Sequence, residues 1–148
     1  MSTVDLVIKG AQLPDGKTAD ICIQGEAIID VTASYKGESV TTIDAKGCVV
    51  LPGLVDLHTH LREPGKEDAE TVLSGSMAAA KGGFVAISAM ANTSPVADTA
   101  GVVEQVYALG QSAGFVDVFP IGAVTQGLNG EALSEIGAMA DSNARVRV

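Results

Sequence analysis

Residues 54–65 read Leu-Val-Asp-Leu-His-Thr-His-Leu-Arg-Glu-Pro-Gly, and this stretch decides the fold. Its first half, from Leu54 to His58, follows the turn residues Pro52-Gly53 and is a short apolar run typical of a buried strand. The only two histidines of the chain, His58 and His60, stand at the end of that run. We therefore expect a strand that carries polar, chemistry-bearing side chains at its carboxyl end.

Strands and helices are expected to alternate after this first strand. The spacing of about 30 residues is typical of βα units, so the pattern predicts an α/β fold with a parallel sheet, either a barrel or an open doubly wound sheet. A closed (β/α)₈ barrel needs roughly 250 residues, so we expect the rest of the barrel to lie outside this chain. The expected elements are helix 67–81, strand 84–90, a helix from Asp98 or Thr99 to Ala113, strand 115–121, helix 131–140 and the start of a strand at 145–148.

Residues 1–51 form a different region, in which short Val- and Ile-rich segments alternate with turn residues. We expect strands over 4–9, 19–23, 27–31 and 48–51. The sequence thus divides into a small β region, residues 1–51, and the beginning of an α/β domain, residues 52–148.

Composition narrows the functional class. The formal net charge of −9 disfavours nucleic acid and anionic membranes as partners, because both require a basic surface. No apolar run reaches the roughly 18 residues of a membrane span, and the first residues lack a signal-peptide pattern. We expect a cytoplasmic protein in which Cys22 and Cys48 are buried thiols.

The two histidines are the strongest candidates for metal ligands. Residues at i and i+2 of a strand point to the same face, so Asp56, His58 and His60 are expected to project together. Two imidazoles on one face can bind one zinc ion if other residues supply the remaining ligands. The alternative is a hydrogen-bonded histidine pair without a metal.

Two further polar residues follow the expected strand ends. Arg62 could hold a substrate carboxylate through two parallel hydrogen bonds, or it could form a surface ion pair with Glu63 or Glu67. Asn92 could bind a polar substrate, or it could form an Asx turn that leads into Pro95. The glycine-containing loop 121–130 has no phosphate-binding pattern and is expected to be a turn or part of a pocket wall.

Together these motifs resemble the amidohydrolase superfamily and, within it, the bacterial type I dihydroorotases. The segment 50–65 resembles the signature of that family, as do Gly82-Gly83-Phe84 and Met90-Ala91-Asn92-Thr93. The resemblance implies a metal-dependent hydrolase with a (β/α)₈ TIM barrel, of which this chain would hold three βα units and the start of strand 4. It also implies a small β-sandwich domain, part of which would be residues 1–51, and one or two zinc ions.

The resemblance also assigns roles to single residues. It makes His58 and His60 metal ligands, and it makes His60, Arg62 and Asn92 binders of the substrate. The implied reaction is the reversible cyclisation of N-carbamoyl-L-aspartate to L-dihydroorotate in pyrimidine biosynthesis. The other metal ligands and the catalytic aspartate would lie beyond Val148, so the 148 residues are expected to be inactive alone. One departure is Ala91, where the family usually has proline.

Other readings of the same motifs stay open at this stage. A hydantoinase- or allantoinase-like cyclic amidase would share the histidine pair but would have less need of Arg62. A catalytically inactive dihydroorotase-like subunit could instead serve as a scaffold for aspartate carbamoyltransferase. The expected partners are the small-molecule substrate and the remainder of the same chain, with a second copy or aspartate carbamoyltransferase as candidate protein partners.

Overall fold

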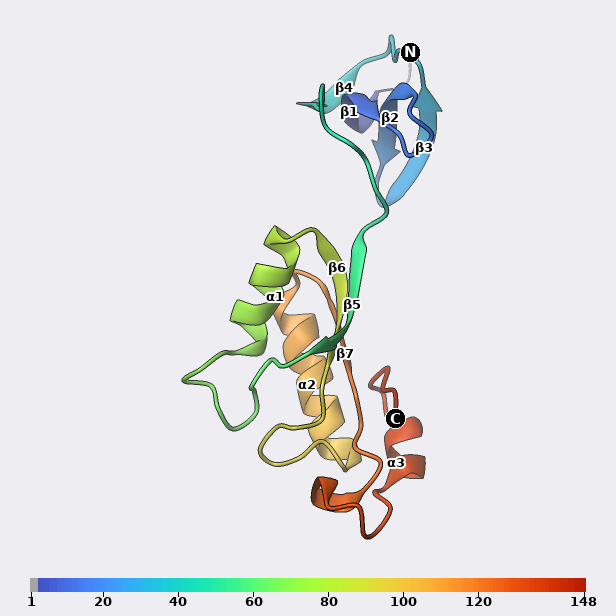
Figure 1. The fold of residues 1–148 in the computed structure, drawn as a ribbon. Coiled ribbons are helices and arrows are strands. Elements are labelled where there is room, and N and C mark those ends of the chain that lie inside the picture. The colour runs from blue at the N-terminus through green and yellow to red at the C-terminus, as the bar shows by residue number, and fades with distance from the viewer. Residues whose placement is uncertain (1–2) are drawn as a thin grey trace. The chain divides into compact units, whose positions relative to one another are not determined.

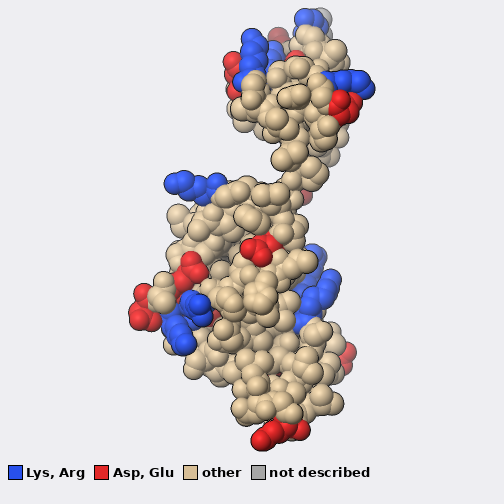
Figure 2. Space-filling view, viewed as in Figure 1, with Lys and Arg blue, Asp and Glu red and all other residues tan. Residues whose placement is uncertain are grey.

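The computed structural model describes residues 3–148 and divides the chain into two compact units, Met1–Pro52 and Gly53–Val148 (Figure 1). In the part of the chain that the structure describes, no helix is both long and apolar enough to cross a membrane. The face drawn in Figure 2 carries its acidic and basic side chains in small separate groups with neutral residues between them.

The first unit is built on one mixed sheet of four strands. Their order is β3-β2-β1-β4, with β4 parallel to β1 and the other neighbours antiparallel. Val4, Val7 and Cys22 form its buried core, against which Tyr35 packs. The strands are β1 (Val4–Gln12), β2 (Thr18–Gln24), β3 (Ala27–Thr32) and β4 (Ser39–Asp44).

Two predictions for this unit were wrong. Strand β4 was not predicted, because Ser39–Asp44 is polar and mostly exposed and so lacks the apolar pattern of a buried strand. Residues 48–51 do not form a strand, and only Val49 makes a single bridge, to Gln12. Cys22 is buried as expected, but Cys48 is exposed because its segment runs outside the sheet.

Asp20 is the buried charged residue that ties this unit together. Its two carboxylate oxygens accept hydrogen bonds from the backbone N–H groups of Gly10 and Tyr35, each at 2.9 Å. The bond from Tyr35, joined by the one from Gly10, holds the pKa of Asp20 below its usual value, although burial acts in the opposite direction. Asp20 therefore joins the β1–β2 hairpin to the segment after β3.

The second unit confirms the predicted alternation of parallel strands and helices. Strands β5 (Leu54–Thr59), β6 (Phe84–Ala89) and β7 (Asp117–Pro120) lie side by side in that order, all parallel. The start predicted for a fourth strand is reduced to one parallel bridge between Arg147 and Ile121. The helices are α1 (Val72–Lys81), α2 (Ala100–Ala113), the 3₁₀ turn η1 (Gln126–Leu128) and the short α3 (Ile136–Ala140).

Helix α1 begins five residues later than predicted, at Val72 instead of residue 67. Thr71 caps it, because the Thr71 side chain accepts from the Ser74 N–H while the Ser74 hydroxyl accepts from the Thr71 N–H. The preceding residues belong to a loop that follows β5. Similarly, the predicted helix 131–140 is helical only over its last turn, Ile136–Ala140.

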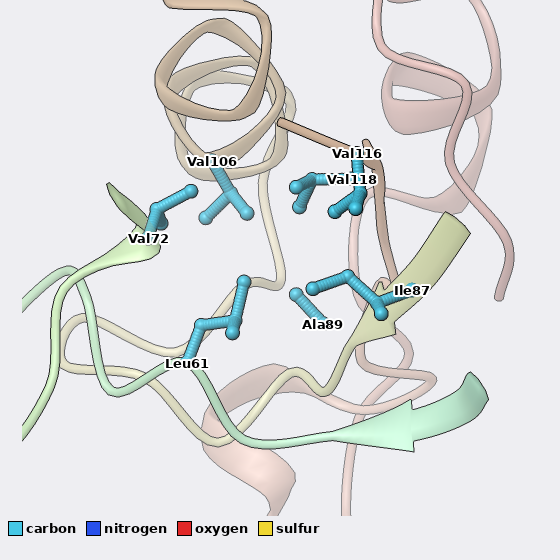
Figure 3. Packing of buried hydrophobic residues seen from close by; sticks show 7 residues of the cluster. All are labelled: Leu61, Val72, Ile87, Ala89, Val106, Val116 and Val118. Atoms are coloured by element: carbon cyan, nitrogen blue, oxygen red, sulfur yellow. The ribbon is translucent and has the colours of Figure 1, made fainter. Parts of the chain in front are cut away.

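One face of the parallel sheet is covered by α1 and α2. Seven buried side chains pack there, and Figure 3 shows them converging from the sheet, both helices and the loop after β5: Leu61, Val72, Ile87, Ala89, Val106, Val116 and Val118. The opposite face, here called the open face, exposes 56% of Val55 and 74% of Leu57.

Candidate metal centre

A β-bulge near the end of β5 decides where the histidines point. Asp56 pairs with Ile87 and Thr59 pairs with Ala89, so β5 advances three residues while β6 advances two. One extra residue is thereby accommodated at Leu57 and His58. Since Ile87 and Ala89 belong to the core beneath the helices, Asp56 and Thr59 lie on the helix-covered side of the sheet.

The prediction that Asp56 projects together with both histidines is met only in part, because Asp56 and His60 line one cavity whereas His58 does not line it. Strict alternation would place all three on one face, but the bulge shifts the alternation by one residue after Asp56. Asp56 instead lines a cavity of about 180 Å³ together with Gly75 and Ala79 of α1. The rings of His58 and His60 remain close together, with His58 exposed and His60 also lining the cavity that Asp56 lines.

The two imidazole rings lie close enough to serve one ion. Their centroids are 5.1 Å apart and the ring planes are inclined by 72°. His58 is exposed and His60 is half-buried, so both side chains are accessible to solvent. This arrangement is the one expected of two ligands at the carboxyl end of a barrel strand.

His60 is oriented by Asn92, which lies in the loop after β6. The Nδ1 atom of His60 and the Oδ1 atom of Asn92 are 2.8 Å apart, and a carbonyl oxygen can only accept, so Nδ1 carries the proton. The Nε2 atom of a neutral His60 then keeps its lone pair and is free to bind a metal. The alternative prediction that the Asn92 side chain forms an Asx turn was wrong, because that oxygen bonds to His60.

Arg62 has a backbone conformation that is unusual for its type. Its φ angle is +62°, in the left-handed region that costs a non-glycine residue roughly 1–2 kcal/mol. The Lys66 N–H donates to its carbonyl oxygen at 2.9 Å and holds it in place. Backbone strain of this kind is concentrated at functional sites, where the surrounding structure maintains it.

The guanidinium of Arg62 is uncommitted. Among residues 3–148 the one ion pair joins Lys17 to Asp15, so the predicted alternative of a surface ion pair at Arg62 was wrong. Both of the proposed acidic partners are engaged elsewhere. The Glu63 carboxylate accepts from the Val72 N–H at 2.7 Å, and the Glu67 carboxylate accepts from the Gly65 N–H at 2.7 Å.

Glu63 supplies the negative charge that the first turn of α1 lacks. Val72 is the first residue of α1, and no acidic residue lies in that turn. The carboxylate therefore satisfies an otherwise free N–H group and places a negative charge at the positive end of the helix. This contact anchors the loop that carries Arg62 to the helix beside the sheet.

The loops after β5 and β6 are also joined to each other. The Ser94 N–H donates to the Pro64 carbonyl oxygen at 2.9 Å. Gly65 passes so close to Ser94 that a Cβ atom there would lie 2.6 Å from the Ser94 Cβ atom. The side chains of His60, Arg62 and Asn92 therefore stand on one connected pair of loops at the carboxyl edge of the sheet.

The loop after β7 contributes structure at the same edge. Its Gly127 N–H donates to the Asp98 carboxylate at 2.8 Å, and its Gly130 N–H donates to the Thr125 hydroxyl at 3.0 Å. These bonds fold residues 121–130 into a turn attached to the segment before α2, as one of the two sequence readings predicted.

The described donor set fits part of a zinc site. His58 and His60 offer two imidazoles in one place, and nitrogen ligands suit zinc. Within residues 3–148 no group of three or more His, Cys, Asp or Glu side chains is placed to hold a metal ion. The imidazoles are therefore a pair of ligands that leaves further coordination positions to other groups.

Comparison with known proteins shows the family of the chain. Residues 47–148 match the family model described as dihydro-orotase-like. The chain belongs to the dihydroorotase family. It is 60% identical over 148 residues to the dihydroorotase of Leifsonia xyli subsp. xyli and 56% identical over 142 residues to that of Streptomyces coelicolor.

Solved structures of related enzymes show the fold of the chain. The L-hydantoinase of Arthrobacter aurescens matches 82% of this chain with a TM-score of 0.70 and 28% identity. The fold is thus that of the TIM-barrel amidohydrolases, as the resemblance implied. The chain spans about a third of the curated dihydroorotases it matches, 34% and 33% of their lengths, and 28% of the hydantoinase.

The structure brings the predicted residues His60, Arg62 and Asn92 onto joined loops, but the contacts of Asp56 and Glu63 were not predicted. Asp56 was expected on the histidine face, and Glu63 was considered only as an ion-pair partner of Arg62. The signal for Glu63 was available, because a carboxylate just before a helix that lacks acidic residues in its first turn is a candidate cap. No comparable signal identifies the bulge at His58.

Proposed function

We propose that this chain is the N-terminal part of a dihydroorotase that interconverts N-carbamoyl-L-aspartate and L-dihydroorotate. The observation that carries the proposal is the grouping of an accessible imidazole pair with an uncommitted guanidinium. Family membership supports the same activity. The full-length protein is the active species, since the described residues supply only part of a metal site.

His58 and His60 are the residues that would hold a metal, most simply zinc. A bound zinc ion would polarise the carbonyl of the ring amide whose C–N bond is broken in the hydrolytic direction. The contribution of this chain is to hold the two rings 5.1 Å apart, with the Nε2 atom of His60 available.

Arg62 and Asn92 would bind the carboxylate of the substrate. The fork of guanidinium N–H groups matches a carboxylate through two parallel hydrogen bonds. Because the Oδ1 atom of Asn92 is bonded to His60, its Nδ2 group remains available as a donor to the same carboxylate. The anchored loops would hold the ring of the substrate against the metal pair.

The carboxylate contact separates this proposal from a hydantoinase- or allantoinase-like activity. We expect Arg62→Ala in the full-length protein to raise the KM for dihydroorotate by roughly 10- to 100-fold, since a hydrogen bond to a charged group contributes about 1.5–3 kcal/mol. Hydrolysis of hydantoin, which has no carboxylate, is the control. Equal effects of Arg62→Ala on both substrates would contradict the proposal.

The partner that the proposal requires is the remainder of the same chain, which would provide the other metal ligands and the catalytic aspartate. A homodimer and a complex with aspartate carbamoyltransferase stay predictions. Cytoplasmic location also stays a prediction. A scaffold without activity would be indicated if the full-length protein bound zinc yet did not open dihydroorotate.

A further inference from the structure

Asp56 is the residue whose position departs most from its sequence pattern. It stands two residues before His58, yet it pairs with Ile87 on the helix-covered side of the sheet. We propose that Asp56 is a positioning residue that holds the bulge in β5 and thereby turns His58 toward the open face. This inference rests on the proposed function, because it concerns how His58 becomes available to a metal.

The bulge in β5 leaves a backbone N–H group without a partner on the neighbouring strand. An extra residue in a strand cannot pair with the neighbouring strand, so a backbone N–H at the bulge needs another acceptor. The His58 N–H donates to the Asp56 Oδ1 atom at 2.9 Å. The carboxylate thus replaces the strand partner that the bulge removes.

The bulge also changes the direction in which the ring of His58 points. In a strand without the bulge, His58 would lie on the same side as Asp56, facing the helices. With the bulge, the ring of His58 is exposed and lies beside that of His60, with the ring centroids 5.1 Å apart. The choice between one and two available imidazoles therefore depends on the local backbone at residues 56–59.

Asp56 lies on the helix-covered side of the sheet, opposite Ile87. Its side chain is half-buried and lines the cavity of about 180 Å³ beneath α1. His60 reaches the same cavity, which is also lined by Gly75, Ala79 and one other acidic residue, Glu70. A carboxylate in this position supports the metal pair through the backbone and is not itself a ligand.

The experiment compares three variants of the full-length protein with the wild type. Asp56→Asn keeps an acceptor oxygen for the His58 N–H but removes the charge, whereas Asp56→Leu removes the acceptor. Glu70→Leu is the matched control, because it makes the same kind of change in the same cavity without touching the His58 N–H. Zinc affinity is measured by competition with a chelator, and amide hydrogen exchange is measured across residues 57–59.

We expect Asp56→Leu to bind zinc about 10- to 100-fold more weakly, the usual effect of losing a residue that orients a ligand, and to exchange faster at residues 57–59. Asp56→Asn and Glu70→Leu should stay within about threefold of the wild type. If Asp56→Leu does not fold, Asp56→Ala provides the same comparison.

Two outcomes would overturn the inference. In the first, Asp56→Leu keeps wild-type affinity and protection. In the second, Asp56→Asn loses as much affinity as Asp56→Leu, which would show that the charge of the carboxylate matters and not its bond to His58. If the wild type itself binds no zinc, the proposed function fails, while the exchange of residues 57–59 still tests the role of Asp56 in the bulge.

Discussion

The contact between Gly65 and Ser94 offers a sharp test of the connected loops. Gly65 has a φ angle of +103°, and an added Cβ atom would lie 2.6 Å from the Ser94 Cβ atom and closer still to the Ser94 carbonyl oxygen. Gly65→Ala must therefore change the backbone and separate the two loops. The separation would break the bond from the Ser94 N–H to the Pro64 carbonyl oxygen.

The expected cost combines two contributions. A non-glycine residue in this backbone region costs about 1–3 kcal/mol, and the lost hydrogen bond adds about 0.5–1.5 kcal/mol, so the loops should be destabilised by roughly 2–4 kcal/mol. Amide exchange of the full-length protein should accelerate over residues 62–66 and 92–95. The KM for dihydroorotate should rise at least tenfold, because Arg62 and Asn92 would no longer be held together.

Gly83→Ala is the matched control in the same unit. Gly83 has a φ angle of +85°, but nothing lies within 4 Å of an added Cβ atom, so the substitution brings backbone strain without a collision. It should lower the melting temperature modestly and leave the KM unchanged. If Gly65→Ala and Gly83→Ala had the same effects on exchange and KM, the loops would not be coupled through this contact.

Substitutions at three residues test single structural features in the full-length protein. Arg62→Gly should be about 1 kcal/mol more stable than Arg62→Ala in thermal denaturation, because glycine adopts the left-handed conformation freely. Both variants should lose the same affinity for dihydroorotate. Equal stabilities of the two variants would contradict backbone strain at Arg62. Glu63→Ala should weaken the first turn of α1 by about 1 kcal/mol, which is measured as faster amide exchange near Val72. Glu63→Gln should restore much of the protection from exchange. Unchanged exchange in Glu63→Ala would contradict the capping role of Glu63. Asp20→Asn should destabilise the protein at neutral pH, because the pKa of Asp20 is lowered in the folded state. The Asp20 carboxylate therefore stabilises the fold above its unfolded pKa of about 4 and loses that effect as the pH falls through the folded pKa. The denaturant midpoints of wild type and Asp20→Asn should converge below about pH 4, and a constant difference would refute this linkage.

The alternation of strands and helices was predictable because it depends on local patterns. Short apolar runs ended at turn residues, and Gly82-Gly83 ended a segment of helix formers just where α1 ends, at Lys81. The start of α1 was not predictable from the same patterns. Residues 67–70 have ordinary helix propensity, but a local hydrogen bond from the Gly65 N–H to the Glu67 carboxylate and the capping box at Thr71 place them in the loop.

The bulge in β5 could not be predicted from the pattern of the sequence. The sequence alternates in the same way whether or not one residue is skipped in the pairing, so periodicity cannot reveal that the face changes after Asp56. The nearness of His58 and His60 was still predicted correctly, because residues two apart stay neighbours on the far side of the bulge. The partner of Asn92 was not predictable, since it lies 32 residues away in sequence.

The most direct test of the histidine pair is the metal content of the full-length protein. Zinc per subunit should be measured for the wild type, His58→Ala and His60→Ala after equilibration with the same free zinc concentration, with circular dichroism to confirm that each variant is folded. We expect bound zinc in the wild type and a loss of at least one equivalent in each variant. Wild-type zinc content in folded His58→Ala and His60→Ala would contradict this expectation.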